Sequence, residues 1–179
     1  MVHRSDDRPY ADAVHFVARI VRETLSLAFF YRRLSAQMAE GDLHGIDDEQ
    51  ARVCQVACFD TIVVNTAKLI EKRSDSWNFY QLYKEWRRYM PDETKGKKAL
   101  GAIDDLRAKL DWLEHYRHTK AAHQTKDDKV TTFTVLPPDI DFLSDVVRVM
   151  DMFVDGKIPY ALYLGESGQQ LDLRKELCL

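Results

Sequence analysis

Hydrophobic residues recur at steps of three and four along most of this chain, a spacing that places them on one face of an α-helix. The first such stripe covers residues 9–38. A second covers 48–72, with Asp47 or Asp48 as the expected N-cap, because a carboxylate there accepts a backbone hydrogen bond from the first turn. Since only seven glycines and five prolines interrupt 179 residues, we expect a mainly helical protein.

The same spacing predicts further helices. The segment 77–89 carries aromatic residues at steps of three, which indicate a face packed into the core or, as the alternative, a platform for stacking bases: Trp77, Tyr80, Tyr83 and Trp86. A polar linker at 91–98 is expected to end this helix. The clearest amphipathic pattern then covers 97–122, and a last helix opens at Pro137 and extends to Val154.

These elements predict an all-α fold, an antiparallel bundle of about five main helices with a short extended segment near 130–135. We expect one helical domain over 9–156, preceded by a flexible N-terminus at 1–8. The tail at 157–179 is expected to be an extension that packs on the bundle or is partly disordered.

Composition narrows the classes of function. With 45% apolar and 11% aromatic residues the chain can build a hydrophobic core, and its net charge of -3 argues against a broadly basic nucleic-acid-binding surface. No basic leader precedes a long apolar run, and no stretch approaches the ~20 apolar residues of a membrane span, so a cytoplasmic protein without membrane contact is expected. Cys54 and Cys58 stand four apart in a helical pattern, which predicts small buried residues rather than zinc ligands.

One position breaks the amphipathic pattern of the helix at 97–122. Its apolar seam is formed by Ile103, Leu106, Leu110 and Leu113. The next position on that seam is Arg117. Because an unpaired cation is costly inside a core, Arg117 must either leave the core or meet an anion. Such a break in a local rule is typical of a functional site.

The seven residues from Arg117 to His123 combine phosphate binding with proton transfer. An arginine can hold a phosphate through a planar set of donors, and an imidazole with a pKa of about 6.5 exchanges a proton at cellular pH. Arg8 and His15 satisfy the same loose spacing and are interpreted as an ordinary solvated helix start. The later pair differs because it stands at the end of the clearest amphipathic pattern and its arginine falls on the core seam.

The run Arg117-His118-Thr119-Lys120-Ala121-Ala122-His123 resembles the signature of the HEPN superfamily, in which an arginine, a polar residue and a histidine have this spacing late in a small helical bundle. A more diffuse resemblance to the abortive-infection (AbiU-type) HEPN-like group covers the runs 59–70 and 78–82. Taken together, the resemblance extends over roughly residues 10–155.

The resemblance implies a HEPN-like bundle that forms a homodimer and, in many members, acts as a metal-independent endoribonuclease in toxin–antitoxin or phage-defence systems. By position, Arg117 and His123 would be the catalytic pair, with His118 in the polar slot where asparagine is commoner. Lys120 would add a second cation and, with Thr119, contact the RNA substrate. No metal or other cofactor is implied. A cognate antitoxin fits this context, although the tyrosine that closely follows the final histidine in some toxins is absent.

For such a site, RNA supplies its own nucleophile. The 2′-hydroxyl lies beside the phosphate, so cleavage is expected to leave a 2′,3′-cyclic phosphate or its hydrolysis product without help from a metal. A group of cations would guide the RNA backbone if it folds near the site and would otherwise be a solvated face: Lys84, Arg87, Arg88, Lys95, Lys97 and Lys98.

Two alternatives remain open. Arg117 could instead pair with an acidic side chain such as Asp111, Glu114 or one on a neighbouring helix, while His123 merely ends its helix, where a cation is favoured. The protein could also be a noncatalytic HEPN-like dimer that serves as a nucleotide-, RNA- or protein-binding module. Binding of RNA without cleavage would indicate this second function.

Overall fold

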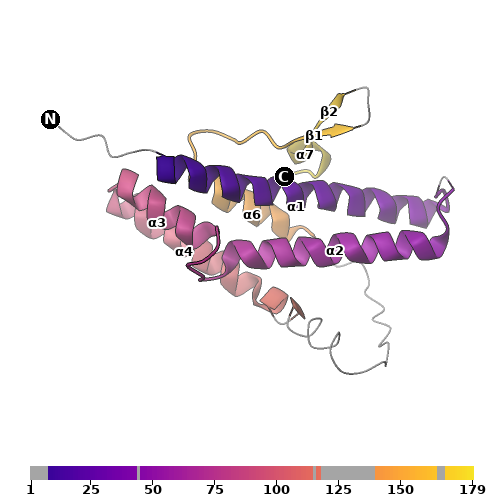
Figure 1. The fold of residues 1–179 in the computed structure, drawn as a ribbon, viewed down its shortest axis with the longest axis horizontal. Coiled ribbons are helices and arrows are strands. Elements are labelled where there is room, and N and C mark those ends of the chain that lie inside the picture. Colours follow the sequence, from indigo (N-terminus) through magenta and orange to yellow (C-terminus); the bar gives the residue numbers. More distant parts are fainter. Residues whose placement is uncertain (1–7, 44, 115, 118–139, 165–167) are drawn as a thin grey trace.

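The computed structural model describes residues 8–43, 45–114, 116–117, 140–164 and 168–179, and this part of the chain is mostly helical (Figure 1). The expected all-α fold is confirmed, with a small antiparallel sheet added to it. The predicted extended segment at 130–135 and the N-terminal residues 1–7 lie outside the described residues. In chain order the elements are α1 (Arg8–Glu40), α2 (Asp48–Ile70), α3 (Phe79–Tyr89), α4 (Glu93–Lys109), α6 (Phe142–Asp151), β1 (Ala161–Leu164), β2 (Gln169–Asp172) and α7 (Leu173–Glu176).

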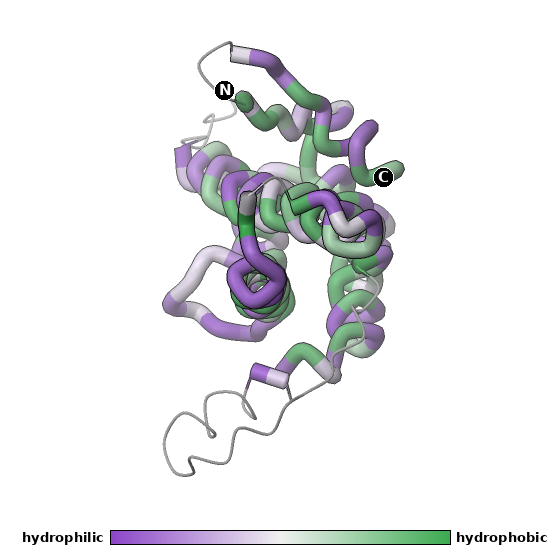
Figure 2. The backbone as a smooth tube through the Cα atoms, turned by 90° about the vertical axis from the view of Figure 1, so that its right-hand side faces the viewer, coloured by the Kyte–Doolittle hydropathy of each residue, from purple (hydrophilic) through white to green (hydrophobic). Residues whose placement is uncertain are grey.

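The long helices α1 and α2 form the hairpin on which the bundle is built. They lie side by side and continue past α3 and α4 toward their connecting turn (Figure 1). Asp47 is the N-cap of α2, as predicted, because its carboxylate accepts a hydrogen bond from the Gln50 N–H at 2.8 Å. Side chains from both helices are fully buried in the core, among them Val17, Val21, Leu25, Ile62, Val63 and Ile70. Hydrophilic and hydrophobic positions accordingly alternate along the helices in Figure 2.

Helix α3 begins at Phe79 rather than at Trp77, because Asn78 is its N-cap. The buried Asn78 side chain accepts a hydrogen bond from the Gln81 N–H at 2.9 Å and donates one to the Arg73 carbonyl at 2.8 Å. Both the oxygen and the nitrogen of the Asn78 side-chain amide thus have hydrogen-bond partners, and these bonds fix the turn between α2 and α3.

The aromatic stripe predicted for this helix is partly correct. Trp86 is buried, and Tyr80 and Tyr83 are half-buried against the core. Trp77, by contrast, stands before the helix and is partly exposed, stacked on Phe16 of α1 with ring centroids 5.6 Å apart. The expectation that Trp77 points into the core is therefore wrong. The helix starts only after its N-cap Asn78, so Trp77 lies outside it.

Helix α4 begins earlier than predicted. Asp92 is its N-cap and accepts a hydrogen bond from the Lys95 N–H at 3.0 Å, so the helix starts at Glu93. The expected polar linker at 91–98 is therefore wrong for most of its length. The linker prediction took charged residues for a loop, whereas here they form the solvated face of a helix.

The continuous helix predicted over 97–122 is also wrong, because the structure breaks it at Leu110. This residue has φ -108° and ψ 19°, and its N–H bonds the carbonyls of Leu106 at 3.0 Å and Arg107 at 3.2 Å, as in a tightened last turn. Residues 111–114 and 116–117 are helical again and are called the post-break segment below. The break changes the direction of the chain while Leu110 and Leu113 both stay buried.

The last part of the chain packs on the bundle. Helix α6 ends at Asp151, short of the predicted Val154, and residues 137–139 lie outside the described residues. Arg174 of α7 forms an ion pair with Asp151 at 2.5 Å, and Arg32 of α1 donates to the Leu177 carbonyl at 3.1 Å. The buried side chains of this extension are Tyr160, Leu173 and Leu177.

The β1–β2 hairpin within this extension was not predicted. Its strands are four residues long, with Leu162 opposite Leu171 in the antiparallel register. Strands this short give little alternation to detect from the sequence.

Helix α2 differs from the prediction in two respects. Cys54 is exposed and Cys58 half-buried, so the expected burial of Cys54 is wrong. Among the described helices, α2 is also long and apolar enough to cross a membrane by length and composition alone, although no such stretch was expected. Core helices pass the same test, and Ile62, Leu69 and Ile70 of α2 lie fully buried in this bundle.

Candidate functional site

Arg117 is the predicted site residue that the structure describes, at the end of the post-break segment. The other predicted residues, His118, Thr119, Lys120 and His123, lie outside the described residues. The geometry of the site is therefore the geometry of Arg117 and its surroundings.

Arg117 forms an ion pair and hydrogen bond with Glu71, its Nη1 contacting Oε1 of the carboxylate. Glu71 is the C-cap of α2 and is buried, with 9% of its side chain exposed, and its N–H bonds the Ala67 carbonyl at 3.1 Å. Arg117 is less enclosed, with 28% of its side chain exposed. The cation on the predicted core seam thus meets an anion on a neighbouring helix, one of the two outcomes expected for it.

Contacts to α2 hold the post-break segment in place. The Tyr116 hydroxyl donates to Asp60 Oδ1 at 2.7 Å, and its ring packs edge-to-face on Phe59 with centroids 5.6 Å apart. Leu113 is fully buried one turn earlier. Burial and the Asp60 carboxylate raise the pKa of Tyr116 well above its usual value, so the phenol stays protonated and keeps donating. Arg117 is consequently anchored by the residues before it as well as by Glu71.

A second set of polar contacts joins the C-terminal end of α4 to its neighbours. Arg107 Nη2 lies 3.4 Å from Glu114 Oε1 and so links the two sides of the helix break. Asp104 accepts a hydrogen bond from the Tyr80 hydroxyl at 2.8 Å and pairs with Lys72 Nζ at 3.2 Å.

The hydrogen-bonded side chains of Tyr80 and Asp104 both have shifted pKa values. Burial and the neighbouring carboxylate raise the pKa of Tyr80 to about 12, and the Tyr80 hydrogen bond lowers the pKa of Asp104.

Among the described residues, the charges near Arg117 are paired rather than broadly basic. Lys72 lies beside Asp104 at 3.2 Å, and Arg73 lies beside Asp75 at 3.1 Å and within 3.9 Å of Glu71. The described residues around Arg117 thus do not themselves form a broad positive field for RNA.

The lysines noted at the start of α4 lie away from this site. Lys95, Lys97 and Lys98 are exposed at the start of α4, whereas the post-break segment follows its end. From Lys97 to the break at Leu110 the helix advances roughly 20 Å. Arg87 is occupied by the Met90 and Asp92 carbonyls, at 3.0 and 2.8 Å. Lys95, Lys97 and Lys98 thus form a solvated face separate from the site, which is the second interpretation given for them above.

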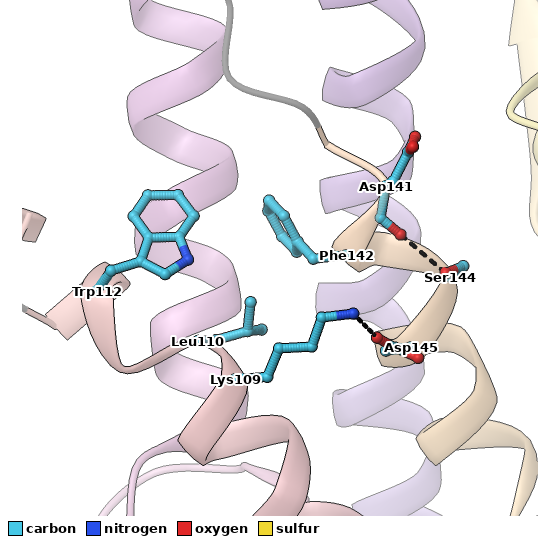
Figure 3. Close-up of a pocket in the computed structure, with 7 residues that line it drawn as sticks. All are labelled: Lys109, Leu110, Trp112, Asp141, Phe142, Ser144 and Asp145. Atoms are coloured by element: carbon cyan, nitrogen blue, oxygen red, sulfur yellow. Dashed lines mark hydrogen bonds and ion pairs between the residues drawn. The ribbon is translucent and has the colours of Figure 1, made fainter.

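A hollow of about 390 Å³ lies next to the helix break (Figure 3). Trp112 of the post-break segment and Phe142 of α6 border it and pack edge-to-face, with centroids 6.1 Å apart. Lys109 and Asp145 form an ion pair at 2.5 Å along its edge. The remaining lining residues are Leu110, Asp141 and Ser144.

Sequence reasoning missed Glu71, Asp60 and Trp112. Glu71 stands out in the sequence only as a charge directly after the apolar end of α2, and nothing there indicates that it faces Arg117. Within the described part of the chain, no group of three or more His, Cys, Asp or Glu side chains is arranged to hold a metal ion.

Comparison with known proteins found no match to any family model, any curated protein or any solved structure.

Proposed function

We propose that this protein is a metal-independent endoribonuclease of the HEPN type. The observation that carries the proposal is the position of Arg117: anchored by buried Glu71, 28% exposed, and six residues before His123 in the sequence. A guanidinium has five N–H donors, and Glu71 is bonded to the Nη1 side of the group. The same group can therefore contact a phosphate while Glu71 fixes its orientation.

The proposed chemistry needs only groups of this chain. His123 acts as general base or acid toward the 2′-hydroxyl and the leaving oxygen, a contribution of roughly 10² to 10⁴ in rate. Arg117 binds the nonbridging oxygens and stabilises the charge that develops on the phosphorus-centred transition state. His118 is the polar member of the catalytic set, and Thr119 and Lys120 contact the RNA next to the scissile phosphate.

The proposal includes a homodimer, and an exposed apolar face of α2 supports it. Val53 and Val56 are 63% and 46% exposed, and Asp60 follows Val56 one turn later on the same side of the helix. Because Asp60 holds Tyr116, this apolar stripe leads toward the post-break segment. A second copy packed on the stripe about a twofold axis would bring two Arg117 groups toward one cleft.

The biological setting is proposed on the HEPN resemblance. An RNA-cleaving enzyme without a metal requirement fits a cytoplasmic toxin–antitoxin or phage-defence system of the abortive-infection kind. In that setting a cognate antitoxin protein would be the natural partner.

The experiment that tests the chemistry compares an oligoribonucleotide with the same strand carrying 2′-deoxyribose, both in the presence of EDTA. We expect cleavage of the RNA alone, with 2′,3′-cyclic phosphate or its hydrolysis product identified on the fragments by mass spectrometry. Cleavage of the deoxy strand, or loss of cleavage in EDTA, would rule out this mechanism.

One observation favours a second function. Arg117 already has a buried partner in Glu71, so its charge is satisfied without a catalytic role. A noncatalytic HEPN-like dimer that binds a nucleotide, RNA or a protein would have the same pair as a structural link. Binding of RNA without cleavage, unchanged in His123→Ala, would identify this function.

A further inference from the structure

The hollow beside the helix break is lined by an exposed aromatic side chain next to apolar and charged groups. Trp112 is 40% exposed, although an aromatic of this size normally buries its rings. Phe142 supports it edge-to-face, and Leu110, which is almost fully buried, forms an apolar wall (Figure 3). A flat aromatic held rigidly at the surface is the usual platform for a nucleobase.

Hydrogen-bonding groups surround this aromatic platform. Asp145 accepts from Lys109 at 2.5 Å and from Arg148 at 2.8 Å, and so presents an oriented carboxylate at the edge of the hollow. The Ser144 hydroxyl donates to the Asp141 carbonyl at 2.8 Å and has acceptor capacity left. A base stacked on Trp112 would thus find acceptors in Asp145 and Ser144 and a donor in the Lys109 ammonium, whereas an aliphatic ligand would leave them unused.

The hollow also involves the segment that carries the proposed catalytic residue. Trp112 and Arg117 belong to the same post-break segment, and five residues of helix correspond to about 7.5 Å along the axis and about 140° around it. The two side chains therefore leave the segment on different faces, Arg117 toward α2 and Trp112 toward α6, and a strand whose phosphate contacts Arg117 has to curve around the segment to place a base at Trp112. Both residues depend on the break at Leu110, which redirects the chain that carries them.

We infer that the hollow lined by Trp112, Phe142 and Asp145 is a base-binding subsite for single-stranded RNA next to the scissile phosphate. This inference rests on the proposed ribonuclease function and names the residue that positions its substrate. Trp112 stacks on the base, and Asp145 with Ser144 contacts its polar edge. The subsite selects an unpaired nucleotide, because a base within a duplex cannot expose its face to the ring.

Binding is measured by fluorescence anisotropy with a labelled 2′-O-methyl oligoribonucleotide, which cannot be cleaved through its 2′-oxygen. Trp112→Ala is expected to raise Kd roughly 5- to 150-fold. Trp112→Phe should recover most of the affinity, since it keeps a stacking ring. Trp77→Ala is the matched control, because Trp77 is similarly exposed but stacks on Phe16 of α1, and it should leave Kd unchanged. Circular dichroism and thermal unfolding confirm that each variant is folded.

An unchanged Kd in folded Trp112→Ala would overturn the inference, as would equal weakening in Trp77→Ala. Loss of self-association in sedimentation with unchanged RNA binding would also overturn it, by showing that Trp112 contacts a protein.

Cleavage kinetics separate this inference from the proposed function. With a cleavable strand, Trp112→Ala should raise KM more than it lowers kcat. Cleavage by the wild type with no effect of Trp112 on Kd or KM would refute the subsite alone. RNA binding that depends on Trp112, without any cleavage, would refute the ribonuclease alone.

Discussion

Glu71 and Arg117 form an ion pair between the end of α2 and the post-break segment, across 46 positions of sequence. Glu71 is the more buried partner, with 9% of its side chain exposed. Among the described residues, removing Arg117 would leave this carboxylate with the weaker ion pair to Arg73, whose Nη1 lies 3.9 Å away. The same ion pair therefore holds the proposed catalytic arginine in place and stabilises the fold.

We predict that Arg117→Ala lowers the free energy of unfolding by about 1–3 kcal/mol, the cost of a buried charge that loses its partner. Glu71→Gln should cost less, because the amide still accepts a hydrogen bond. Urea unfolding of both single variants and of Arg117→Ala/Glu71→Gln gives the coupling energy, expected at about 0.5–3 kcal/mol. Strictly additive losses would show that the two side chains do not interact in solution.

Two glycines of α4 should respond in opposite ways to alanine. A Cβ on Gly96 would stand 2.9 Å from Arg87 Cζ and displace a side chain that bonds two backbone carbonyls, whereas a Cβ on Gly101 meets nothing within 4 Å. Gly101→Ala should stabilise the protein by about 0.5–1 kcal/mol, through lower chain entropy in the unfolded state. Gly96→Ala should destabilise it by about 1 kcal/mol, because the lost bonds of Arg87 outweigh that gain. Urea unfolding of both variants measures these changes. If Gly96→Ala stabilised the protein as much as Gly101→Ala, the close contact between Gly96 and Arg87 would be contradicted.

Tyr80 should make stability depend on alkaline pH. Its hydroxyl donates to Asp104 at 2.8 Å, and burial together with that carboxylate raises its pKa to about 12. The contribution is fully present below the unfolded-state pKa of about 10 and is lost as pH rises toward the folded-state value. Tyr80→Phe should therefore cost about 1 kcal/mol at pH 8, and the difference from wild type should shrink at pH 11.5. Urea unfolding of wild type and Tyr80→Phe at pH 8 and pH 11.5 measures this difference in stability. A difference that is the same at both pH values would refute the raised pKa of Tyr80.

A lysine in the exposed apolar stripe of α2 should prevent dimerisation. Val56→Lys places a charge on the face proposed to pack against a second copy, and multi-angle light scattering should report a monomer. Tyr163→Lys is the matched control, since Tyr163 is 66% exposed on the β1 strand and lies outside that face. A wild type that is monomeric at all accessible concentrations would remove the dimer from the proposal.

The helical fold could be predicted from the sequence wherever local signals were sufficient. The stripe of α1 and the Asp47 cap of α2 depend on neighbouring residues alone, and the structure confirms both. The break at Leu110 is different, because residues 106–114 contain neither glycine nor proline. There the tertiary contacts of Leu113 and Tyr116 with the rest of the bundle fix a turn that helix propensity does not require.

The candidate site was predictable only in part for the same reason. The mismatch of Arg117 with its apolar seam predicted that it either leaves the core or meets an anion. Which of the two occurs, and the identity of the anion, depend on how α2 lies beside the post-break segment. The hollow at Trp112 likewise exists only because the helix breaks and α6 packs against the turn. Neither feature follows from residue spacing.

Catalysis by His123 is tested by the single-turnover rate of RNA cleavage in EDTA, compared between wild type, His123→Ala and His15→Ala. His15 is the matched control, because with Arg8 it repeats the loose arginine–histidine spacing at the start of α1. We predict that wild type and His15→Ala cleave at the same rate, and that His123→Ala is slower by roughly 10² to 10⁴. A His123→Ala protein that cleaves as fast as wild type, or a folded wild type that binds RNA and never cleaves it, would contradict the account.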